Sequence, residues 1–359
     1  MNLSNIAQAY NILLENFEIH KLGNGLIHKT FLLKNKTETE NSFVLQNINT
    51  HVFKEPEIIA HNCHLASLYL KEKHPSYTFL NFLKTKNNQN FYTDINGALW
   101  RLMYFIENTI SYDTLDNKEL AYASAHEFAK LTNLLSHSNI KNYKEPIPNF
   151  HNLEKRFNDF KISVIEANSE RLAMAKDLID FSHQHQEIKE HYQTIKAKDL
   201  IPIRIIHADT KINNILFDKN TLKPLCVVDL DTLMPGYFFS DLGDMFRTML
   251  CNCSEDEVDK EKIILRHNFF ESIVSGYLKG MNNSLTKEEI KLLTYSGKFM
   301  LYMQGLRFLT DFLQNDIYYP ISYNQHNLDR AACQFHILKI YLKEENSLKK
   351  IIEPYLSNC

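Results

Sequence analysis

The spacing of apolar side chains divides the chain into a strand-rich first third and a mainly helical remainder. Residues 4–16 carry apolar side chains at helical spacing, namely Ile6, Tyr10, Leu13 and Leu14. Runs rich in β-branched and aromatic residues predict strands at 17–22, 26–33, 43–46 and 98–105, and a helix begins near Pro56. A short strand from Phe91 precedes Asn96-Gly97, which predicts a hairpin turn into the strand 98–105.

Beyond residue 107, apolar positions recur mostly at helical spacing. A broad apolar stripe runs through 120–135, further helices follow within 152–195, and another packed stripe lies near 297–314. At 359 residues, two domains are a better expectation than one compact domain. The pattern predicts an α+β protein.

Composition and charge narrow the functional classes. The 40 basic and 43 acidic residues are interspersed and give a net charge of −3, so no basic stripe indicates nucleic-acid binding. No apolar run reaches the ~18 residues of a membrane span. The N-terminus has neither a basic start nor a small-residue cleavage site, so we do not expect a secretory signal. Six cysteines, far apart except Cys251 and Cys253, indicate reduced intracellular thiols. We therefore expect a soluble, cytoplasmic protein without a membrane, nucleic-acid or obligate protein partner.

The stretch 201–231 concentrates the candidate chemistry. A β-branched run at 201–206 predicts a buried strand, and a polar loop follows it with His207, Asp209, Lys211 and Asn214. Residues 218–221 then predict a hairpin turn between two short apolar runs, and the hairpin ends at Asp229-Leu230-Asp231. Such a hairpin brings Asn214, at its entrance, beside Asp229, at its exit. Oxygen ligands of this kind suit Mg²⁺ better than zinc.

This arrangement has the parts that phosphoryl transfer needs, because that reaction depends mostly on positioning and charge neutralisation. Asp209 is the candidate to orient a substrate hydroxyl and take its proton, and Lys211 to stabilise charge on the transferred group. Asn214 and Asp229 are the predicted metal ligands, assisted by Asp231. Asp and Asn are also common turn formers, so the prediction rests on the conjunction of strand, loop, hairpin and exit carboxylate.

Most of the chain resembles one family of small-molecule kinases. His207, Asp209, Asn214 and Asp229 resemble the signature of the aminoglycoside/choline phosphotransferase branch of the kinase-like fold. The longer string HADTKINNILFD…PLCVVDLDTLMPG…SDLGDMFR is similar to the N-acetylhexosamine 1-kinase family within that branch. Further similar segments are LGNGLIHKTFL (22–32), FVLQNINTHVFKEPE (43–57), LWRLMYFIENTISYD (99–113) and GLRFLTDFLQNDIYY (305–319).

The resemblance implies a fold and an activity. The fold is bilobal and protein-kinase-like, with a small antiparallel-sheet N-terminal lobe for the nucleotide (1–106) and a larger, mainly helical catalytic and substrate-binding lobe (107–359). The implied activity is ATP- and Mg²⁺-dependent phosphorylation of the anomeric hydroxyl of N-acetylglucosamine or N-acetylgalactosamine, which yields the sugar 1-phosphate. The implied substrate is therefore an amino sugar.

Three segments contact the nucleotide according to this resemblance. The glycine turn Gly23-Asn24-Gly25 forms a flap over the phosphates, because glycine lets the backbone approach closely. Gln46 stands on the third strand, where kinase-like proteins usually carry a phosphate-pairing lysine. Tyr104, Phe105 and Ile106 form the crossover that meets adenine. On the residues alone, an ordinary hairpin turn is favoured at 23–25, and a β-sheet core explains 104–106 as well as an adenine contact does.

Some charged residues have a structural alternative beside the role implied by the resemblance. Arg307 contacts the sugar or the developing phosphate charge by resemblance, whereas its i,i+4 spacing to Asp311 equally predicts a surface ion pair. Asp241 braces the catalytic loop by resemblance, whereas its place near a helix start favours capping. His207 is expected to shape the loop by hydrogen bonding rather than to act as a base.

Two alternatives to the sugar kinase stay open. The first is a kinase of another acceptor, such as choline, an amino alcohol, an aminoglycoside or a different sugar, because the H-x-D core is common to them. The second is a non-catalytic ligand-binding homologue, which Gln46 and the poor glycine loop support and the complete Asp209, Lys211, Asn214 and Asp229 set opposes. Protein kinase activity is disfavoured, because no DFG triplet or A-P-E segment follows Asp229.

Overall fold

The computed structural model describes residues 3–22, 27–37 and 40–357. The chain divides into two compact units, each assembled from three segments. The first unit comprises Met1–Ile110, His137–Pro148 and Leu216–Met234, and the second comprises Ser111–Ser136, Asn149–Ile215 and Pro235–Cys359. The first unit therefore contains two stretches that lie well beyond the boundary expected near residue 107.

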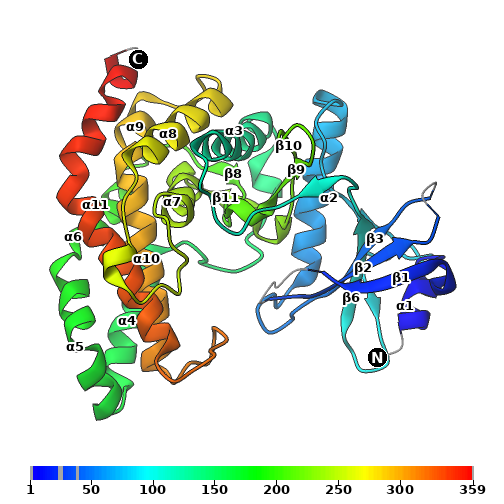
Figure 1. Ribbon diagram of the computed structural model, residues 1–359, viewed down its shortest axis with the longest axis horizontal. Coiled ribbons are helices and arrows are strands. Elements are labelled where there is room, and N and C mark those ends of the chain that lie inside the picture. The colour runs from blue at the N-terminus through cyan, green and yellow to red at the C-terminus, as the bar shows by residue number, and fades with distance from the viewer. Residues whose placement is uncertain (1–2, 23–26, 38–39, 358–359) are drawn as a thin grey trace. The chain divides into compact units, whose positions relative to one another are not determined.

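An antiparallel sheet forms the centre of the first unit (Figure 1). Its strands are β1 (Phe17–Lys21), β2 (Lys29–Asn35), β3 (Phe43–Asn47), β4 (Phe82–Leu83), β5 (Tyr92–Thr93) and β6 (Leu99–Tyr104). Neighbours follow the order β1-β2-β3-β6-β4, and β5 pairs with β6. Gln46 and Arg101 face each other across β3 and β6.

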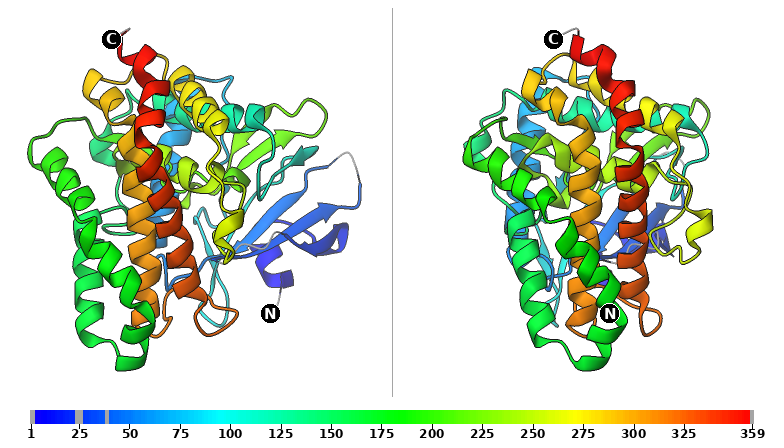
Figure 2. Two further views of the ribbon diagram at one scale, coloured as in Figure 1. Left: turned by 60° about the vertical axis from the view of Figure 1, so that its left-hand side comes forward. Right: turned by 90° about the vertical axis from the view of Figure 1, so that its left-hand side faces the viewer.

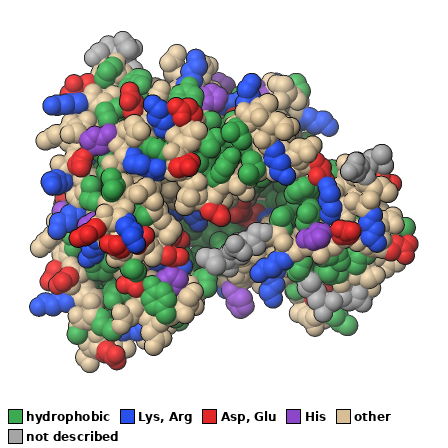
Figure 3. All heavy atoms as spheres, viewed as in Figure 1, with side chains coloured by type: hydrophobic (Ala, Val, Ile, Leu, Met, Phe, Trp, Pro, Cys, Tyr) green, Lys and Arg blue, Asp and Glu red, His purple; other side chains and the backbone are tan. Residues whose placement is uncertain are grey.

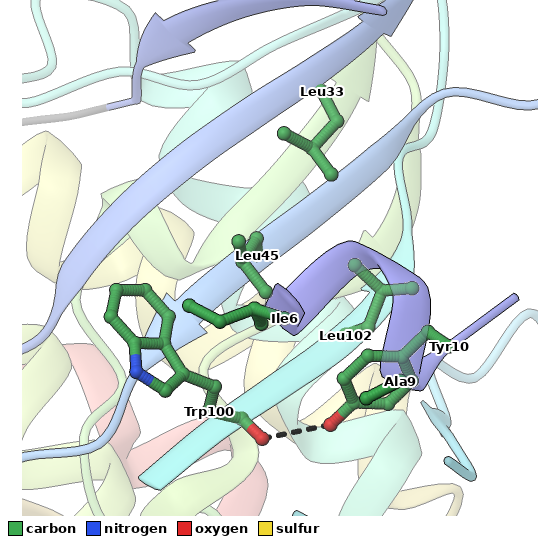
Figure 4. Packing of buried hydrophobic residues seen from close by; sticks show 7 residues of the cluster. All are labelled: Ile6, Ala9, Tyr10, Leu33, Leu45, Trp100 and Leu102. Carbon is green, nitrogen blue, oxygen red and sulfur yellow. Dashed lines mark hydrogen bonds between the residues drawn. The ribbon is translucent and has the colours of Figure 1, made fainter. Parts of the chain in front are cut away.

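Helix α1 (Leu3–Ala9) closes the apolar face of this sheet (Figure 4). The cluster consists of Ile6, Ala9, Tyr10, Leu33, Leu45, Trp100 and Leu102. Burying side chains of this size stabilises a fold by roughly 1.5–3 kcal/mol each, and the Tyr10 hydroxyl donates to the Trp100 carbonyl at 2.7 Å. The helix predicted over 4–16 is too long: Asn11 has a φ of 58°, which ends the helix before the 3₁₀ turn η1 (Leu14–Asn16).

A long helix and a small second sheet complete the first unit. The helix is α2 (Pro56–Lys73), and the sheet has the order β10-β9-β7, with β7 (Thr109–Ile110), β9 (Ile215–Asp218) and β10 (Pro224–Val227). The unit also contains the 3₁₀ turns η2 (Ile140–Asn142) and η4 (Leu230–Thr232). The hairpin predicted around residues 218–221 is confirmed. Asp218 Oδ1 accepts from the backbone N–H groups of Asn220 at 3.0 Å and Thr221 at 2.7 Å, which is the geometry of an Asx turn.

The second unit is mainly helical. Its helices are α3 (Lys118–Leu134), α4 (Leu153–Glu166), α5 (Ser169–Gln184), α6 (Glu187–Ala197), α7 (Phe238–Met249), α8 (His267–Met281), α9 (Lys287–Lys291), α10 (Leu293–Leu313) and α11 (His326–Ser357). Shorter elements are β8 (Arg204–Ile206), β11 (Met234–Gly236), η3 (Ile212–Asn214) and η5 (Lys260–Lys262). The views of Figure 2 show α10 and α11 side by side, and α10 also packs against α7 and α4.

Local sequence explains where these helices begin and how closely they pack. The side chains of Asn117, Asn152 and Asn168 cap α3, α4 and α5 by accepting from backbone N–H groups of the first turn, and Thr286 forms a capping box with Glu289 at α9. Helices α3 and α8 approach closely because Gly276 has no side chain: a Cβ there would lie 2.2 Å from the Tyr122 carbonyl oxygen.

The structure confirms the predicted α+β architecture, and some of its elements are shorter than predicted. The strand predicted over 201–206 is β8, which begins only at Arg204. In the described part of the chain, no helix has both the length and the apolar character that crossing a membrane requires. Acidic and basic side chains lie interspersed over the face drawn in Figure 3, in keeping with the net charge of −3.

Candidate functional site

The polar loop that follows β8 is held by one carboxylate from α7. Asp241 Oδ2 accepts from the His207 N–H at 3.0 Å, and Asp241 Oδ1 accepts from the Ala208 N–H at 2.7 Å. The Thr210 hydroxyl donates to the Asp241 carbonyl oxygen at 2.7 Å. Ala208 has a φ of 62°, a backbone conformation that costs energy for a residue with a Cβ. The bonds to Asp241 offset this cost and fix the loop.

The capping role predicted for Asp241 is wrong. Helix α7 begins three residues earlier, at Phe238, so Asp241 lies inside the first turn and points to the loop rather than to its own helix end. Gly243 lets α7 approach α10, because a Cβ there would lie 2.3 Å from the Ser296 carbonyl oxygen. Burial raises the pKa of Asp241 to about 6, despite the two N–H groups and His207 that favour its ionised form.

Asp209, Lys211 and Asn214 lie together in this loop, as the sequence predicts. Lys211 Nζ lies 3.3 Å from Asp209 Oδ1, and Asn214 Nδ2 donates to the Asp209 carbonyl oxygen at 2.8 Å and to Oδ2 at 3.2 Å. These bonds occupy the amide nitrogen of Asn214 and leave its amide oxygen as the atom that can bind a cation. His207 Nδ1 accepts from the Asp209 N–H at 3.2 Å, which fits its expected role in shaping the loop.

Neighbouring side chains keep the Asp209 carboxylate ionised. Burial raises the pKa of Asp209, but Lys211, His207 and Arg247 outweigh burial and lower it below its usual value. In turn, the Asp209 carboxylate raises the pKa of Lys211, so its ammonium stays charged. The loop therefore presents a carboxylate and an ammonium ion in contact, each still partly exposed.

An ion-pair network that sequence reasoning missed lies close enough to this loop to act on the charges of Asp209 and Lys211. Arg247 Nε donates to Asp244 Oδ1 at 2.8 Å, and Arg247 Nη1 donates to Glu255 Oε2 at 2.7 Å. Burial opposes ionisation of Glu255, but Arg247 and Lys211 lower its pKa to about 2. The i,i+3 spacing of Asp244 and Arg247 was the signal available in the sequence.

Asp229, the second predicted metal ligand, lies in the first unit, whereas Asn214 lies in the second. Asp229 follows β10 and has φ 56° and ψ 54°, which is the left-handed conformation. Their pairing about a metal ion therefore stays a prediction.

Asp231, predicted to assist at the metal, has other partners within the first unit. Arg101 Nη1 lies 2.5 Å from Asp231 Oδ1, Arg101 Nη2 donates to Oδ2 at 2.9 Å, and His28 Nε2 lies 2.7 Å from Oδ2. Only 3% of Asp231 is exposed. Arg101 and His28, neither of which sequence reasoning identified, thus engage both carboxylate oxygens.

The nucleotide-binding residues expected from the resemblance are placed only in part. Gly23, Asn24 and Gly25 lie outside the described residues. Gln46 Oε1 accepts from Arg101 Nε at 2.9 Å, and Gln46 Nε2 donates to the Thr30 hydroxyl at 3.1 Å.

The crossover segment lies where β6 ends. Tyr104 is the last residue of β6 and is 47% exposed, the Phe105 N–H donates to the Ser42 carbonyl at 2.9 Å, and the Ile106 carbonyl accepts from the Thr109 hydroxyl at 2.8 Å. The adenine contact proposed for Tyr104, Phe105 and Ile106 stays a prediction.

Arg307 does not pair with Asp311, so the alternative of a surface ion pair is wrong. The Asp311 carboxylate instead accepts from the backbone N–H groups of Tyr318 and Tyr319, at 2.8 and 2.9 Å. Arg307 Nη1 donates to Gln304 Oε1 at 2.9 Å, and its guanidinium lies over the Phe150 ring, 4.8 Å from the centroid. Arg307 is therefore held by neutral groups and keeps its positive charge unpaired by a carboxylate among these contacts.

Comparisons with known proteins relate this site to one family. A family model described as APH: Phosphotransferase enzyme family matches residues 22–270, well over half of the chain. The structure of amicoumacin kinase hAmiN in complex with AMP-PNP, Ca²⁺ and Ami is similar, with a TM-score of 0.63 and 13% identity over 94% of this chain and 92% of that chain.

Two further solved structures are similar over nearly their whole lengths. Choline kinase from Cryptosporidium parvum Iowa II has a TM-score of 0.59 and 14% identity, covering 99% of this chain and 98% of that chain. The microcompartment-associated aminopropanol kinase has a TM-score of 0.59 and 15% identity, covering 96% and 97%. Likeness at these identities shows a shared fold, so the predicted kinase-like fold is confirmed.

Proposed function

The chain belongs to the phosphotransferase enzyme family, and within that activity we propose that it transfers the γ-phosphoryl group of ATP to a hydroxyl group of an N-acetylhexosamine. The observation that carries the proposal is the Asp209 loop, in which an ionised carboxylate lies 3.3 Å from the Lys211 ammonium and 3.2 Å from the Asn214 amide. The similar amicoumacin kinase was solved with AMP-PNP and Ca²⁺, which supports a nucleotide and a divalent cation here.

The chain's donor atoms suit Mg²⁺. The amide oxygen of Asn214 and the carboxylate of Asp229 are hard oxygen ligands, and Mg²⁺ in kinases is bound by one or two such groups together with phosphate oxygens. We leave Asp231 out of this set, because Arg101 and His28 already engage both of its oxygens. A bound divalent cation neutralises charge on the nucleotide phosphates.

The residues of the loop then have distinct roles in the transfer. Asp209 accepts a hydrogen bond from the acceptor hydroxyl and takes its proton as the new O–P bond forms and the bond to the ADP leaving group breaks. Its lowered pKa means that it is ionised at neutral pH and available to accept this proton. Lys211 stabilises the charge on the transferred phosphoryl group, and Asp241 keeps the loop in place.

Charge around Arg307 supports a neutral acceptor over a cationic one. Arg156 and Arg307 lie near each other, and burial together with Arg307 lowers the pKa of Arg156 to about 10. Burial and these two arginines also lower the pKa of His151 well below its usual value, so it stays uncharged. Arg247 acts on both His151 and Asp209, which links this region to the catalytic loop.

The Arg307 guanidinium would repel choline, an amino alcohol or an aminoglycoside, whereas it can donate hydrogen bonds to a neutral sugar. Arg156 is less available, because it donates to the Phe150 carbonyl at 3.1 Å and lies 3.9 Å from Asp159. The segment 305–319, which resembles the hexosamine kinases, contains Arg307. These observations favour the amino sugar as the acceptor.

The proposal is tested by ADP release with Mg²⁺-ATP across a panel of acceptors. The panel contains N-acetylglucosamine, N-acetylgalactosamine, glucose, galactose, choline and kanamycin, and Asp209→Asn serves as the control. We expect turnover on an N-acetylhexosamine, loss of turnover in the control, and a product that is stable to alkali but labile to acid, as expected of a sugar 1-phosphate. Turnover on choline or kanamycin alone would keep the phosphoryl transfer and overturn the acceptor.

A further inference from the structure

A buried cluster of charged side chains in the first unit lies two residues after the proposed metal ligand Asp229. Arg101, from β6, is 1% exposed and makes two bonds to Asp231, which is 3% exposed and belongs to η4. His28, just before β2, adds a third bond to the same carboxylate at 2.7 Å. Removing such charges from water costs several kcal/mol per ion, so the cluster persists only because its members satisfy one another.

Hydrogen bonds around the cluster assign its charge state. His28 Nδ1 accepts from the Asn49 N–H at 3.1 Å, so Nδ1 carries no proton and Nε2 is the atom that donates to Asp231. His28 is therefore neutral, and the charges of Arg101 and Asp231 cancel.

This cluster also accounts for Gln46. Gln46 faces Arg101 across the two strands and accepts from its Nε at 2.9 Å. A lysine at position 46 would place a second cation beside Arg101 in a buried site, whereas the glutamine oxygen completes the hydrogen bonds of the guanidinium.

The cluster and helix α2 hold the same short turn. The Cys63 thiol donates to the Leu230 carbonyl at 3.6 Å, and Asn62 Nδ2 donates to the Leu233 carbonyl at 2.8 Å. Asp229 begins this turn in the left-handed conformation, which costs roughly 1–2 kcal/mol for a residue with a side chain. The strained residue at 229 is thus followed at once by a turn that β6, residue 28 and α2 all hold.

We propose that Arg101, His28 and Asp231 form a positioning cluster that fixes the backbone of Asp229 and so aims its carboxylate at the divalent cation, with Asp231 itself making no bond to the metal. This inference rests on the proposed function, in which Asp229 is a metal ligand. In the Asp-Leu-Asp sequence, Asp229 then binds the metal, and Asp231 holds the backbone that positions it. By occupying both oxygens of Asp231, the cluster also prevents that carboxylate from competing for the cation.

The test measures metal binding separately from turnover, by titrating the protein with Mn²⁺ in the presence of AMP-PNP and following the free ion by electron paramagnetic resonance. Asp231→Asn loses an acceptor for Arg101, so the turn loosens and we expect the dissociation constant for Mn²⁺ to increase about tenfold. The matched control is Glu289→Gln, which breaks another buried bidentate pair, Arg204–Glu289 with two contacts of 2.7 Å, in the second unit. The control should lower stability and leave the Mn²⁺ affinity within about twofold, the scatter we allow for a change remote from the site.

A second variant separates positioning from direct ligation and remains informative if Asp231→Asn folds poorly. His28→Leu removes one of the two bonds to Asp231 Oδ2, leaving the one from Arg101 Nη2, and removes one support of the turn. If the cluster positions Asp229, Mn²⁺ binding weakens; if Asp231 is itself a ligand, binding is unchanged or tighter. Unchanged Mn²⁺ affinity in both variants would overturn the inference. Failure of the wild type on every acceptor would count against the proposed function alone, because the Mn²⁺ titration does not depend on turnover.

Discussion

Two aspartates, Asp209 and Asp231, show how differently the same side chain is used in the two units. Each lies in a short loop or turn beyond a strand, and each has a cation within 3.3 Å. The side chain of Asp209 is 23% exposed and meets one lysine and one amide, whereas that of Asp231 is 4% exposed and has two bonds from Arg101 and one from His28. A nearby cation therefore does not identify a catalytic carboxylate. Free lone pairs and access do, because only Asp209 can still accept a hydrogen bond from a substrate.

The strongest test of this comparison is Asp209→Asn, for which we expect a fall in kcat of about 10²–10⁴-fold, the range for loss of a general base. Asparagine keeps the size of the side chain but cannot take the proton of the acceptor hydroxyl. ATP binding and the temperature of unfolding should change little, since Asp209 is partly exposed. Steady-state kinetics, a nucleotide-binding titration and thermal unfolding measure the three quantities. Equal turnover in the variant would show that Asp209 is not the base, and Asp209 would then no longer differ from Asp231 in function.

Asn214→Ala sharpens the comparison by removing the amide that joins Asp209 to the proposed metal site. We expect the Mg²⁺ concentration for half-maximal activity to increase roughly 10–100-fold, because one oxygen ligand and the hydrogen bond that orients it are lost together. Mg²⁺ titration of activity at saturating ATP provides the measurement. Asn220→Ala, in the exposed turn between β9 and β10, is the control and should behave like the wild type. An unchanged Mg²⁺ requirement in Asn214→Ala would remove Asn214 from the metal site.

Two arginines differ in the same way, because one is paired with a carboxylate and the other contacts neutral groups. Arg171 is 2.7 Å from the Asp316 carboxylate and also donates to the Phe312 carbonyl, whereas Arg307 contacts an amide and aromatic rings. We expect Arg307→Gln to increase KM for the sugar about tenfold, the equivalent of about 1.4 kcal/mol, because the guanidinium can still donate to an acceptor. The matched variant Arg171→Gln should lower the temperature of unfolding and leave KM unchanged. Kinetics with the acceptor varied at saturating Mg²⁺-ATP decide between them, and an effect on KM from Arg171→Gln alone would reverse the assignment.

Local sequence was enough to predict the Asp209 loop. Asp209, Lys211 and Asn214 lie within six positions of one another, so a strand followed by a turn places them together whatever the rest of the chain does. Turn chemistry predicted the hairpin at 218–221 for the same reason. The prediction that Asp241 caps α7 was wrong because it depended on the first residue of that helix. Helix boundaries are the least certain part of a sequence pattern.

Interactions between distant residues could not be predicted in this way. Asp231 is 130 positions from Arg101 and 203 from His28, and a hydrophobic pattern gives no information on which polar residues meet. One signal was available: Arg101 stands inside the apolar run Leu-Trp-Arg-Leu-Met, and a charge in a buried strand needs a partner. The helix predicted over 4–16 was too long for a local reason: Asn11 adopts a positive φ, which apolar spacing does not reveal.

The smallest expected effect concerns Asp241, which differs from Asp231 in being buried without a cation bonded to its carboxylate oxygens. Burial raises the pKa of Asp241 from 3.8 to about 6. Because this pKa is higher in the folded than in the unfolded chain, the folded state binds more protons between about pH 4 and 6. The contribution of Asp241 to the free energy of unfolding therefore increases as pH falls through 6. For Asp231, whose pKa is lowered, the contribution has the opposite sign and is lost in acid.

Asp241→Asn removes this titration, and urea unfolding at pH 7 and pH 5 measures the consequence. We expect the stability of the wild type relative to the variant to increase by about 1 kcal/mol between pH 7 and pH 5. Asp177→Asn, at an exposed position of α5, should show no such dependence on pH and serves as the control. A difference between wild type and Asp241→Asn that stays constant with pH, or shrinks as pH falls, would mean that the loop amides and His207 outweigh burial. Asp241 would then be a stabilised carboxylate like Asp231, and burial without a paired cation would no longer set it apart.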